Sequence, residues 1–584
     1  MENMYPSATS PVTLSLAASP LFQRANPILS LDERTELTYQ RARAIAKAYA
    51  LTPQDVVFLR PKFWQLHTDQ IAPMDGAATT LLTIQYNLAA GTLAPFAFKR
   101  PELQPILKKI MDFDVSAQFL LSEVGHGLDS PNLETTATLL PTGEFDLHTP
   151  NPSAAKWMPP TAPKGNMPRV AVVIARLIVD GENRGVRPFV VALGDGHQMC
   201  RGITSKVLPQ RAGSKPVDHA LTYFNHVRLP AAALLGSPEK PKDLRQNFLS
   251  VIWRVGVGSL ALSTLSITAL KASVYVAGRY SLRRTVTGAN GAPMPIIAFR
   301  TQQLPIFHTL AQVFVLEAYA QDAAEQFVSP DLDPRVRHGI AATLKAVMLQ
   351  HCQSSLYTLA ERCGAQGLFE HNQIIESQLE MRGVAIAEGD VLALCIRLAS
   401  ELLIGRYDMP PPRDPTGLLA RHEAGLFEEA RQVVANLGAS HRSEGFNRLI
   451  LPLCQPLIEA IGHRMAYEAA TKAKVHPDLL ALYLAGVVKY DSSWYVEHMG
   501  LGRRAQHEME DRALTSALPH LELFLEQTGA RPYCIAPIAS DESWNKFVNS
   551  LPHFDGEAVL DLIPETRGSL SGATIGFDTT AARL

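Results

Sequence analysis

The chain has 584 residues and a formal net charge of −2 at pH 7, with 54 Lys and Arg against 56 Asp and Glu. This near-neutral balance, without a basic block, argues against nucleic acid as a partner. At this length and with 46% hydrophobic residues, the chain is expected to form several domains, because single cores stop growing at about 250–300 residues.

The spacing of the cysteines matches no known disulfide or metal-binding pattern. Six of them, at positions 200, 352, 363, 395, 454 and 534, show neither paired spacing nor a CxxC. This pattern predicts neither a disulfide scaffold nor a zinc site and favours a reducing compartment. The sequence also has no HExxH, P-loop or GxSxG motif, so we expect no catalytic metal.

The first part of the chain divides into a tail and a helical region. Residues 1–30 contain several prolines but no basic stretch followed by a long apolar core, so we expect an exposed tail rather than a signal peptide. Residues 31–115 show helical spacing, with a charged face at Asp32–Arg34 and an apolar stretch from Ala77 to Leu93. This segment is the predicted N-terminal helical domain.

Between residues 116 and 245 the pattern changes to β-branched runs. Val170–Val179 and Phe189–Leu193 are such runs, and turn clusters separate them. This texture predicts a middle β-domain. Its end is marked by Gly236–Lys242, which reads as a linker.

Residues 246–408 are predicted to form a helical bundle. The low-charge run Val255–Leu270 is 16 residues long and carries five Ser or Thr, so we expect a buried helix rather than a membrane span. Asp333 as N-cap with Pro334 at the first helical position predicts a helix that begins there and runs towards Gly364.

The last part of the chain is predicted to be a second C-terminal helical domain, residues 417–584. The proline-rich segment Met409–Pro415 separates it from the bundle. Within it Leu457, Ile461 and Met465 recur on one helical face. The expected fold class is therefore α+β: an N-terminal helical domain, a middle β-barrel-like domain, a helical bundle and a second helical domain.

One carboxylate stands out as a candidate base. Glu388 lies between a small apolar run and Gly389, and the apolar segment Leu392–Ile404 follows. Loss of water raises the pKa of a carboxyl group and makes it a usable proton acceptor for a weak carbon acid near neutral pH. Taken alone, a glutamate before a helix is more often a solvated residue or a cap.

A series of motifs places Glu388 in a wider context. In chain order they are Ser122–Gly127, Leu133–Thr138, Phe145–Pro150, Ala155–Trp157, Ala175–Gly181, Gly185–Phe189, Val227–Pro230, Arg279–Arg284, Thr301–Gln303, Cys363–Gly367 and Ala387–Asp390. Their order and spacing resemble those of the acyl-CoA oxidases. The chain is thus similar to members of the acyl-CoA oxidase and acyl-CoA dehydrogenase superfamily.

The resemblance implies an FAD-dependent oxidoreductase that introduces an α,β double bond into an acyl thioester such as acyl-CoA, as in fatty acid β-oxidation. Glu388 would take the α-proton, and dioxygen would reoxidise the flavin to give hydrogen peroxide. Nearly two hundred residues follow Glu388, which favours the oxidase architecture. A flavin desaturase or dehydrogenase with a specialised acyl substrate, and a non-catalytic relative, remain as alternatives.

The resemblance also implies which residues contact the flavin. These are Ser122, Gly127, Lys156, Trp157, Arg284, Gln303, Gly364 and Gly367. Arg284 and the Gly364–Gly367 loop would contact FAD held mainly by another subunit, so a homodimer is expected. The structural alternatives are that Trp157 is a core residue, that Arg284 is a surface charge and that the two glycines cap a helix.

Several positions depart from the family pattern. After Lys156 and Trp157 the family continues with a tryptophan, a proline and two glycines, whereas this chain has Met158–Pro163. Arg300 stands where a glutamine is usual, and Ala365 and Gln366 replace a glycine and a histidine. Prolines remove backbone donors and fix φ, so we expect an altered flavin-side loop and a specialised acyl group.

The chain also contains two short patterns with known functional counterparts. Gly256–Ala261 fits the dinucleotide GxGxxA spacing, but its surroundings favour helix packing. The final tripeptide, Ala582–Leu584, is a conservative variant of the Ser-Lys-Leu peroxisomal address and predicts a peroxisomal location, with the cytoplasm as the alternative.

Overall fold

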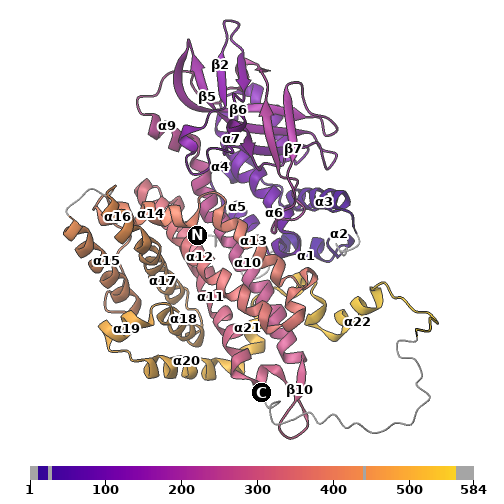
Figure 1. Ribbon diagram of the computed structural model, residues 1–584, viewed down its shortest axis with the longest axis vertical. Helices are drawn as coiled ribbons and strands as arrows, with labels where there is room; N and C mark the ends of the chain where they lie inside the picture. The colour runs from indigo at the N-terminus through magenta and orange to yellow at the C-terminus, as the bar shows by residue number, and fades with distance from the viewer. Residues whose placement is uncertain (1–10, 24–28, 438–441, 561–584) are drawn as a thin grey trace, which may run out of the picture.

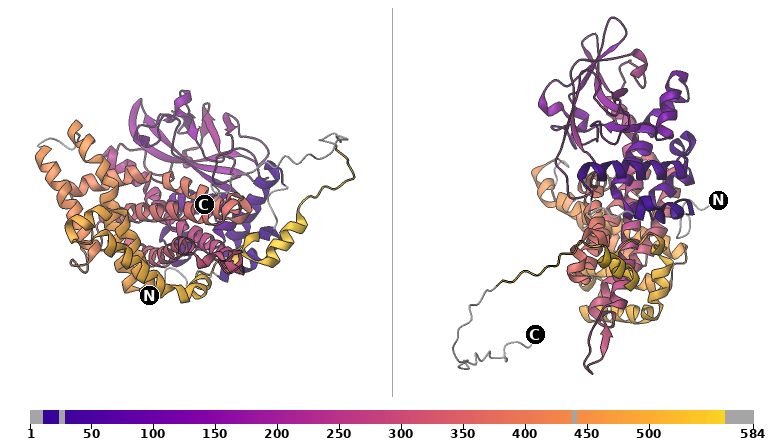
Figure 2. Two further views of the ribbon diagram at one scale, coloured as in Figure 1. Left: turned by 60° about the horizontal axis from the view of Figure 1, so that its bottom comes forward. Right: turned by 90° about the vertical axis from the view of Figure 1, so that its right-hand side faces the viewer.

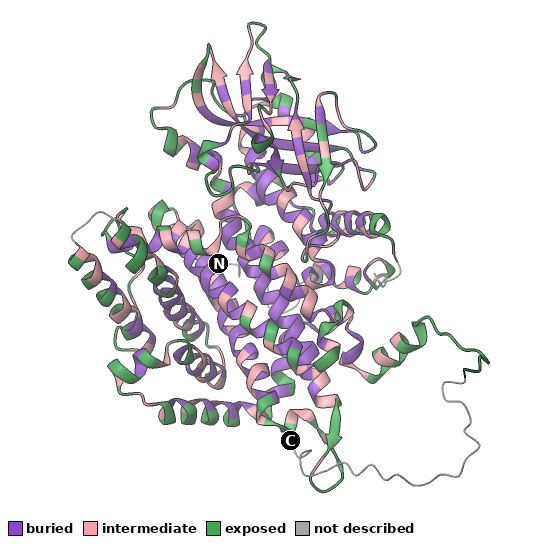
Figure 3. Ribbon diagram, viewed as in Figure 1, coloured by how far each residue is buried: buried purple, intermediate pink, exposed green. Residues whose placement is uncertain are grey.

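The protein is described here by a computed structural model that covers residues 11–23, 29–437 and 442–560 (Figure 1). A β-rich unit lies at one end of the long axis, and helices form the remainder (Figures 1 and 2). The mixed architecture confirms the expected α+β class. Buried residues concentrate in the central helices and between the strands (Figure 3).

The N-terminal helices include two that the sequence did not predict. The helices are α1 (Pro11–Ala17), α2 (Pro20–Gln23), α3 (Leu31–Tyr49), α4 (Pro53–Val57), α5 (Pro61–His67), α6 (Gly76–Thr83), the π-helix η3 (Ile84–Ala90), α7 (Gly91–Ala97) and α8 (Gln104–Met111). The expectation of an exposed tail is wrong for residues 12–23. The Thr13 hydroxyl donates to Asp69 at 2.6 Å, and Phe22 is 1% exposed. Proline is tolerated in a first helical turn, so it marked helix starts here instead of a tail.

The β-domain consists of two sheets. Its strands are β1 (Ser116–Leu120), β2 (Thr136–Leu139), β3 (Phe145–His148), β4 (Lys156–Trp157), β5 (Arg169–Val179), β6 (Glu182–Gly194), β7 (Ile203–Val207), β8 (Ala220–Phe224) and β9 (Val227–Leu229). The larger sheet has the order β1-β5-β2-β3-β9, with β6 paired to β5, and it curls into a half-barrel. The smaller sheet has the order β4-β8-β7. The predicted linker follows and contains no helix or strand from Gly236 to Lys242.

A bundle of long helices lies below the β-domain (Figure 1). It comprises α9 (Leu244–Val251), α10 (Trp253–Arg283), α11 (Arg300–Val328), α12 (Pro334–Arg362), α13 (Ile374–Ile386) and α14 (Val391–Leu403), with the hairpin β10 (Thr285–Thr287) and β11 (Pro293–Pro295) after α10. Asp333 caps α12 by accepting from the Arg335 amide, which confirms the predicted start of that helix. Among the described residues, α10 alone is long and apolar enough to cross a membrane, and its apolar stretch is wholly buried inside the protein.

The C-terminal helices divide between two places. They are α15 (Leu418–Leu437), α16 (Glu444–Leu449), α17 (Cys454–Lys472), α18 (Pro477–Tyr490), α19 (Ser492–Met499), α20 (Arg503–Ala517), α21 (Leu521–Gln527) and α22 (Asp541–Ser550). The helices from α15 to α20 stand beside the bundle (Figure 1). The chain after α20 then packs against the N-terminal region and the bundle. The Thr528 carbonyl accepts from Gln70, and the Ile535 amide donates to Gln373 at 3.0 Å. The predicted domain 417–584 is therefore not one unit.

Candidate active site

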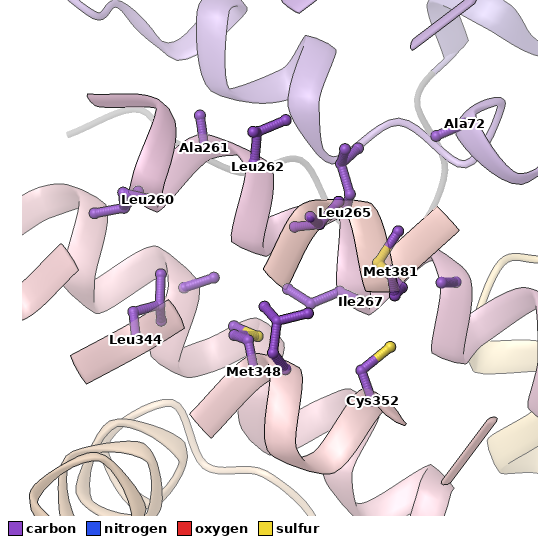
Figure 4. Close-up of a cluster of buried hydrophobic side chains, with 14 of the residues drawn as sticks. Ala72, Leu260, Ala261, Leu262, Leu265, Ile267, Leu344, Met348, Cys352 and Met381 are labelled. Carbon is purple, nitrogen blue, oxygen red and sulfur yellow. The ribbon is translucent and has the colours of Figure 1, made fainter. Parts of the chain in front are cut away.

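A large cavity lies where the N-terminal helices, the β-domain and the bundle meet. Its volume is about 1500 Å³, and its walls come from α6 and η3, the β-domain, α9, α10 and α13. Ordinary small-molecule sites are about 300–1,000 Å³, so this cavity has room for more than one ligand group. Leu262 and Leu265 of α10 and Met381 of α13 form part of an apolar wall (Figure 4).

Glu388 projects into this cavity from the short connection between α13 and α14. Its backbone has φ +55°, and its Oε2 accepts a hydrogen bond from the Asn87 side-chain amide at 2.8 Å. A Cβ atom added to Gly258 of α10 would fall on the Glu388 carboxyl group. Glycine at position 258 is thus what allows the carboxyl group to lie against α10.

The surroundings of Glu388 suit a proton acceptor. Burial raises the pKa of Glu388 to about 8, and the opposing effects of Lys345, Arg254 and the Asn87 hydrogen bond do not cancel that rise. The part of Glu388 that is still exposed lines the cavity. A carboxyl group with this pKa, facing the cavity, can act as a general base near neutral pH.

Two buried cations hold the Glu388 loop. The Lys345 ammonium donates to the carbonyls of Ala387 and Gly389 at 2.5 and 2.6 Å, on either side of Glu388. Arg254 Nε donates to the Asn87 carbonyl at 2.7 Å. Burial lowers the pKa of Lys345 to about 8 and that of Arg254 to about 9. The Glu388 carboxyl group is therefore fixed in position and in orientation by groups from three other elements.

The sequence interpretation missed these supporting residues. Asn87 is 301 positions from Glu388 and Arg254 is 134, and nothing in their local sequence marks them. The one available signal was Gly258, which lies within the GxGxxA pattern. That pattern does belong to a helix, α10, as expected, but Gly258 also makes room for the base.

The neighbouring acids have other roles. Asp390 caps α14, since its side chain accepts from the Ala393 amide at 3.0 Å. Glu380 accepts from the Ser214 hydroxyl at 2.7 Å and from the Ser214 amide. Glu388 is thus the acid on this loop whose carboxyl group faces the cavity beside two cations.

Three of the predicted flavin residues lie on the same cavity. Ser122, Gly127 and Trp157 line its β-domain wall, and the Trp157 amide donates to the Ser122 carbonyl at 3.0 Å. Trp157 is 41% exposed, so it is not a core residue. A Cβ on Gly127 would meet nothing within 4 Å, so this position does not require a glycine for reasons of space.

Lys156 is placed differently. Its ammonium is fully buried and donates to Glu123 at 3.0 Å, to the Ile174 carbonyl at 2.7 Å and to the Leu121 carbonyl at 3.1 Å. Burial lowers its pKa to about 8. The side chain therefore braces the strand that presents Trp157 and does not enter the cavity.

The other four predicted flavin residues lie away from the cavity. Arg284 is exposed at the far end of α10, about 39 Å along the helix from Gly258 at 1.5 Å per residue. Gln303 is buried, and its side-chain oxygen accepts from Arg300 at 3.1 Å. Gly364, at φ +58°, and Gly367 follow α12. The eight residues thus form two separate groups within one chain.

The altered flavin-side loop has its own contact. Met158 adopts φ +82°, and its carbonyl accepts from His219 Nδ1 at 2.7 Å. Burial lowers the pKa of His219 to about 4, so the ring is neutral and Nε2 carries the lone pair. Nε2 is buried without a hydrogen-bond partner among the described residues, and His219 lines the cavity.

A group of arginines lines the cavity near the Glu388 end. They are Arg245, Arg335, Arg337, Arg397 and Arg406. Arg335 already binds Asp333 at 2.6 Å, and Arg406 approaches Glu401 at 3.4 Å. Guanidinium groups bind phosphates through paired hydrogen bonds, so this rim suits an anionic ligand.

Comparisons with known proteins agree with this geometry. Residues 258–403 match the family described as "Acyl-CoA oxidase, C-alpha1 domain". The chain is 27% identical over 350 residues to "Putative acyl-coenzyme A oxidase 3.2, peroxisomal" of Arabidopsis thaliana, which covers 57% of this chain and 51% of the relative. It is 26% identical over 395 residues to "Peroxisomal acyl-coenzyme A oxidase 3" of Homo sapiens, covering 62% and 55%. The matches therefore span about half the length of these curated relatives.

Solved structures share the fold. Acyl-coA oxidase1 from Yarrowia lipolytica has a TM-score of 0.78 at 19% identity, covering 92% of this chain and 89% of that one. Acyl-CoA oxidase-1 in Caenorhabditis elegans, complexed with FAD and ATP, has a TM-score of 0.75 at 17% identity, covering 94% and 91%. Residues 258–403 therefore match an acyl-CoA oxidase domain, and over most of its length the chain shares the fold of the acyl-CoA oxidases.

Proposed function

We propose that the protein is an FAD-dependent acyl-CoA oxidase, which introduces an α,β double bond into an acyl thioester and passes the electrons to dioxygen to form hydrogen peroxide. The observation that carries this proposal is Glu388, a carboxyl group with a raised pKa that faces a large cavity and is held by Asn87, Lys345 and Arg254. Ser122 and Trp157 line the same cavity from the β-domain.

The cavity residues fit a flavin ring. Trp157 offers an aromatic surface, Ser122 a hydroxyl donor, and His219 an unsatisfied acceptor that a ring N–H can fill. When bound, FAD supplies the hydride acceptor and the route to dioxygen. Prolines 159 and 160 carry no backbone N–H, so the donors on this loop are fewer than in the family pattern.

The chain's own residues supply proton transfer, orientation and binding. The Glu388 carboxylate accepts the α-proton, and the nearby cations Lys345 and Arg254 favour its ionised form. The Lys345 hydrogen bonds keep the loop from moving when the carboxyl group changes charge. The arginine rim binds the phosphates of the CoA part, and the apolar wall around Leu262 and Leu265 holds acyl carbons away from water.

We also propose a homodimer. Arg284 and the Gly364–Gly367 loop are too far from Gly258 in one chain to serve the same cavity, but they can contact a cofactor held by a second copy. A peroxisomal location is proposed because the matched relatives are named peroxisomal. The Ala582–Leu584 tripeptide lies outside the described residues.

One observation favours the second candidate, a dehydrogenase or desaturase of the same fold. The Met158–Pro163 loop changes the cofactor-side wall, which is where an electron acceptor must be reached. The oxidase is favoured because helices α15 to α20 follow the bundle, as in the matched oxidase structures.

The test starts with the colour of the purified protein. We expect a yellow protein with oxidised-flavin absorbance, bleaching of that absorbance by an acyl-CoA without oxygen, and peroxide release under air. A colourless protein that takes up no added FAD contradicts the flavoenzyme proposal. Bleaching without peroxide supports the dehydrogenase instead.

A further inference from the structure

The end of the cavity away from Glu388 is polar, whereas its middle is apolar. On each of three elements, the lining residues change from apolar to polar with increasing distance from Glu388. They are α10, with Leu262 and Leu265 before Thr268; α13, with Val384 and Met381 before Glu380 and Glu376; and η3 with α6, with Ile84 before Thr83, Thr80 and Thr79. A cavity for a plain hydrocarbon chain has no need of such a polar end.

Contacts between these elements set the spacing of the two ends. A Cβ on Gly76 would lie 2.6 Å from the Glu380 carboxyl carbon, which places Gly76 beside the polar end. Asn87, eleven residues later, binds Glu388. At 1.5 Å per helical residue, these eleven residues place the polar end about 16.5 Å from the contact between Asn87 and Glu388. The Ser266 hydroxyl meets the Met381 sulfur at 3.6 Å between them and confirms that α10 and α13 run side by side.

Glu376 is the group at this end with unused hydrogen-bonding capacity. It lies in the first turn of α13, yet its carboxyl group makes no hydrogen bond to a described residue and caps no amide. Burial, reinforced by Glu380 and Asp75, raises its pKa to about 8, and Arg34 opposes the rise only in part. A protonated carboxyl group offers one O–H donor and free acceptor sites.

Glu380, one turn further along α13, makes a useful contrast. Both of its oxygens accept hydrogen bonds from Ser214, so its capacity is used within the protein. Thr80 donates to the Gly76 carbonyl, and Thr268 donates to the Leu265 carbonyl, so each keeps lone pairs but no spare donor. Arg211 also lines this part of the cavity, near Glu380, and its Nε donates to the Gly213 carbonyl. Glu376 is therefore the carboxyl group at the polar end whose hydrogen-bonding capacity is not used by the described residues.

We propose that this end of the cavity binds a hydroxyl group on the distal part of the acyl chain, with Glu376 as the residue that selects for it. The inference rests on the proposed function, because it takes the ligand to be an acyl thioester anchored at Glu388. A neutral hydroxyl matches a site with one donor and several acceptors. A carboxylate tail matches it less well, because it would face both Glu376 and Glu380, with Arg211 as the neighbouring positive charge.

The test measures binding without turnover. Pairs of acyl-CoA thioesters of equal chain length, one plain and one carrying a terminal hydroxyl, are titrated calorimetrically against the FAD-loaded Glu388→Gln protein over a series of lengths. We expect the hydroxylated member to bind about 10-fold or more tightly at the best length, because a buried group left unpaired is costly. Glu376→Leu should remove that preference, and Glu376→Gln, which keeps a donor and an acceptor, should retain most of it.

A matched change elsewhere serves as the control. Glu497 is exposed on α19 (Ser492–Met499), so Glu497→Leu should leave the preference intact. Equal binding of plain and hydroxylated thioesters, or equal effects of Glu376→Leu on both, would overturn the inference. Tighter binding of an amino-terminated acyl chain would also overturn the inference, because it would assign the polar end of the cavity to a cation. Loss of FAD from Glu376→Leu with selectivity unchanged assigns the end to the cofactor and also overturns it.

The outcome for catalysis is read separately. Wild-type protein is assayed for flavin bleaching and for peroxide with the same thioesters. Selective binding without any bleaching contradicts the proposed function but supports the assignment of Glu376. Bleaching by both thioesters at the same rate and affinity supports the proposed function and contradicts the assignment.

Discussion

The Glu388 loop and the Met158–Pro163 loop face the same cavity but are built in opposite ways. The Glu388 loop is fixed by buried cations and keeps the family's Glu-Gly pair. The other loop has lost the family's glycines, gained prolines, and left His219 Nε2 without a partner. In the proposed function, the loop that would take the proton keeps the family pattern, and the loop that would meet the cofactor departs from it. Substitutions on each side can break or sharpen this contrast.

Apart from replacement of Glu388 itself, the largest effect is expected from closing the space beside its carboxyl group. In Gly258→Ala the new methyl group must displace the Glu388 carboxyl group, and misplacement of a base by about 1 Å costs on the order of 10²-fold in rate. Flavin content should be unchanged. Gly256→Ala is the control, since its methyl group would meet only His338 at 3.6 Å. Equal activity of the two variants would show that Gly258 does not position the base.

A smaller loss of catalytic activity is expected from Lys345→Met. The variant frees the carbonyls of Ala387 and Gly389 and removes a charge that favours ionised Glu388, so the pKa of Glu388 should rise further above about 8. We expect about a 10-fold loss of kcat/KM at pH 7, recovered in part at higher pH. Lys271→Met removes another buried lysine, which pairs with Glu317 outside the cavity, and should not move the pH profile.

Arg284, which lies far from the cavity of its own chain, tests the proposed cofactor contacts. Arg284→Ala should lower FAD content several-fold and weaken the oligomer together, because cofactor binding and assembly are linked by mass action. Absorbance ratios and sedimentation measure the two effects. Arg283→Ala, which removes a neighbour paired with Asp541, is the control. A wild-type monomer with full FAD would contradict the shared site.

The smallest effect is on stability. The pKa of Glu388 is raised from 4.5 to about 8 in the folded protein, so its contribution is fully present below pH 4.5 and is lost as the pH rises through 8. Between pH 6 and 9 the wild-type Tm should therefore fall relative to that of Glu388→Gln, which cannot ionise. Each pKa unit corresponds to about 1.4 kcal/mol, so the difference is at most a few kcal/mol. Parallel Tm curves would show that Glu388 ionises freely in water.

Much of this arrangement could be predicted from the sequence, because its signals are local. Glu388 lies between apolar flanks, the strands are β-branched, and Asp333 with Pro334 marks a helix start. Asn87 and Arg254 carry no local mark, since their importance arises from packing between distant elements. The helices within residues 11–23 were missed because prolines at helix starts resemble those of a tail.

The central claim is that Glu388 removes the α-proton, and rapid mixing of FAD-loaded protein with an acyl-CoA without oxygen tests it most directly. Wild-type flavin should bleach, and Glu388→Gln should keep its fold, its FAD and its substrate affinity while the bleaching rate falls by a factor on the order of 10² to 10⁴. Bleaching of the variant at the wild-type rate would contradict the claim. Glu380 and Asp390 would then be the acids to examine next, despite the hydrogen bonds that occupy them.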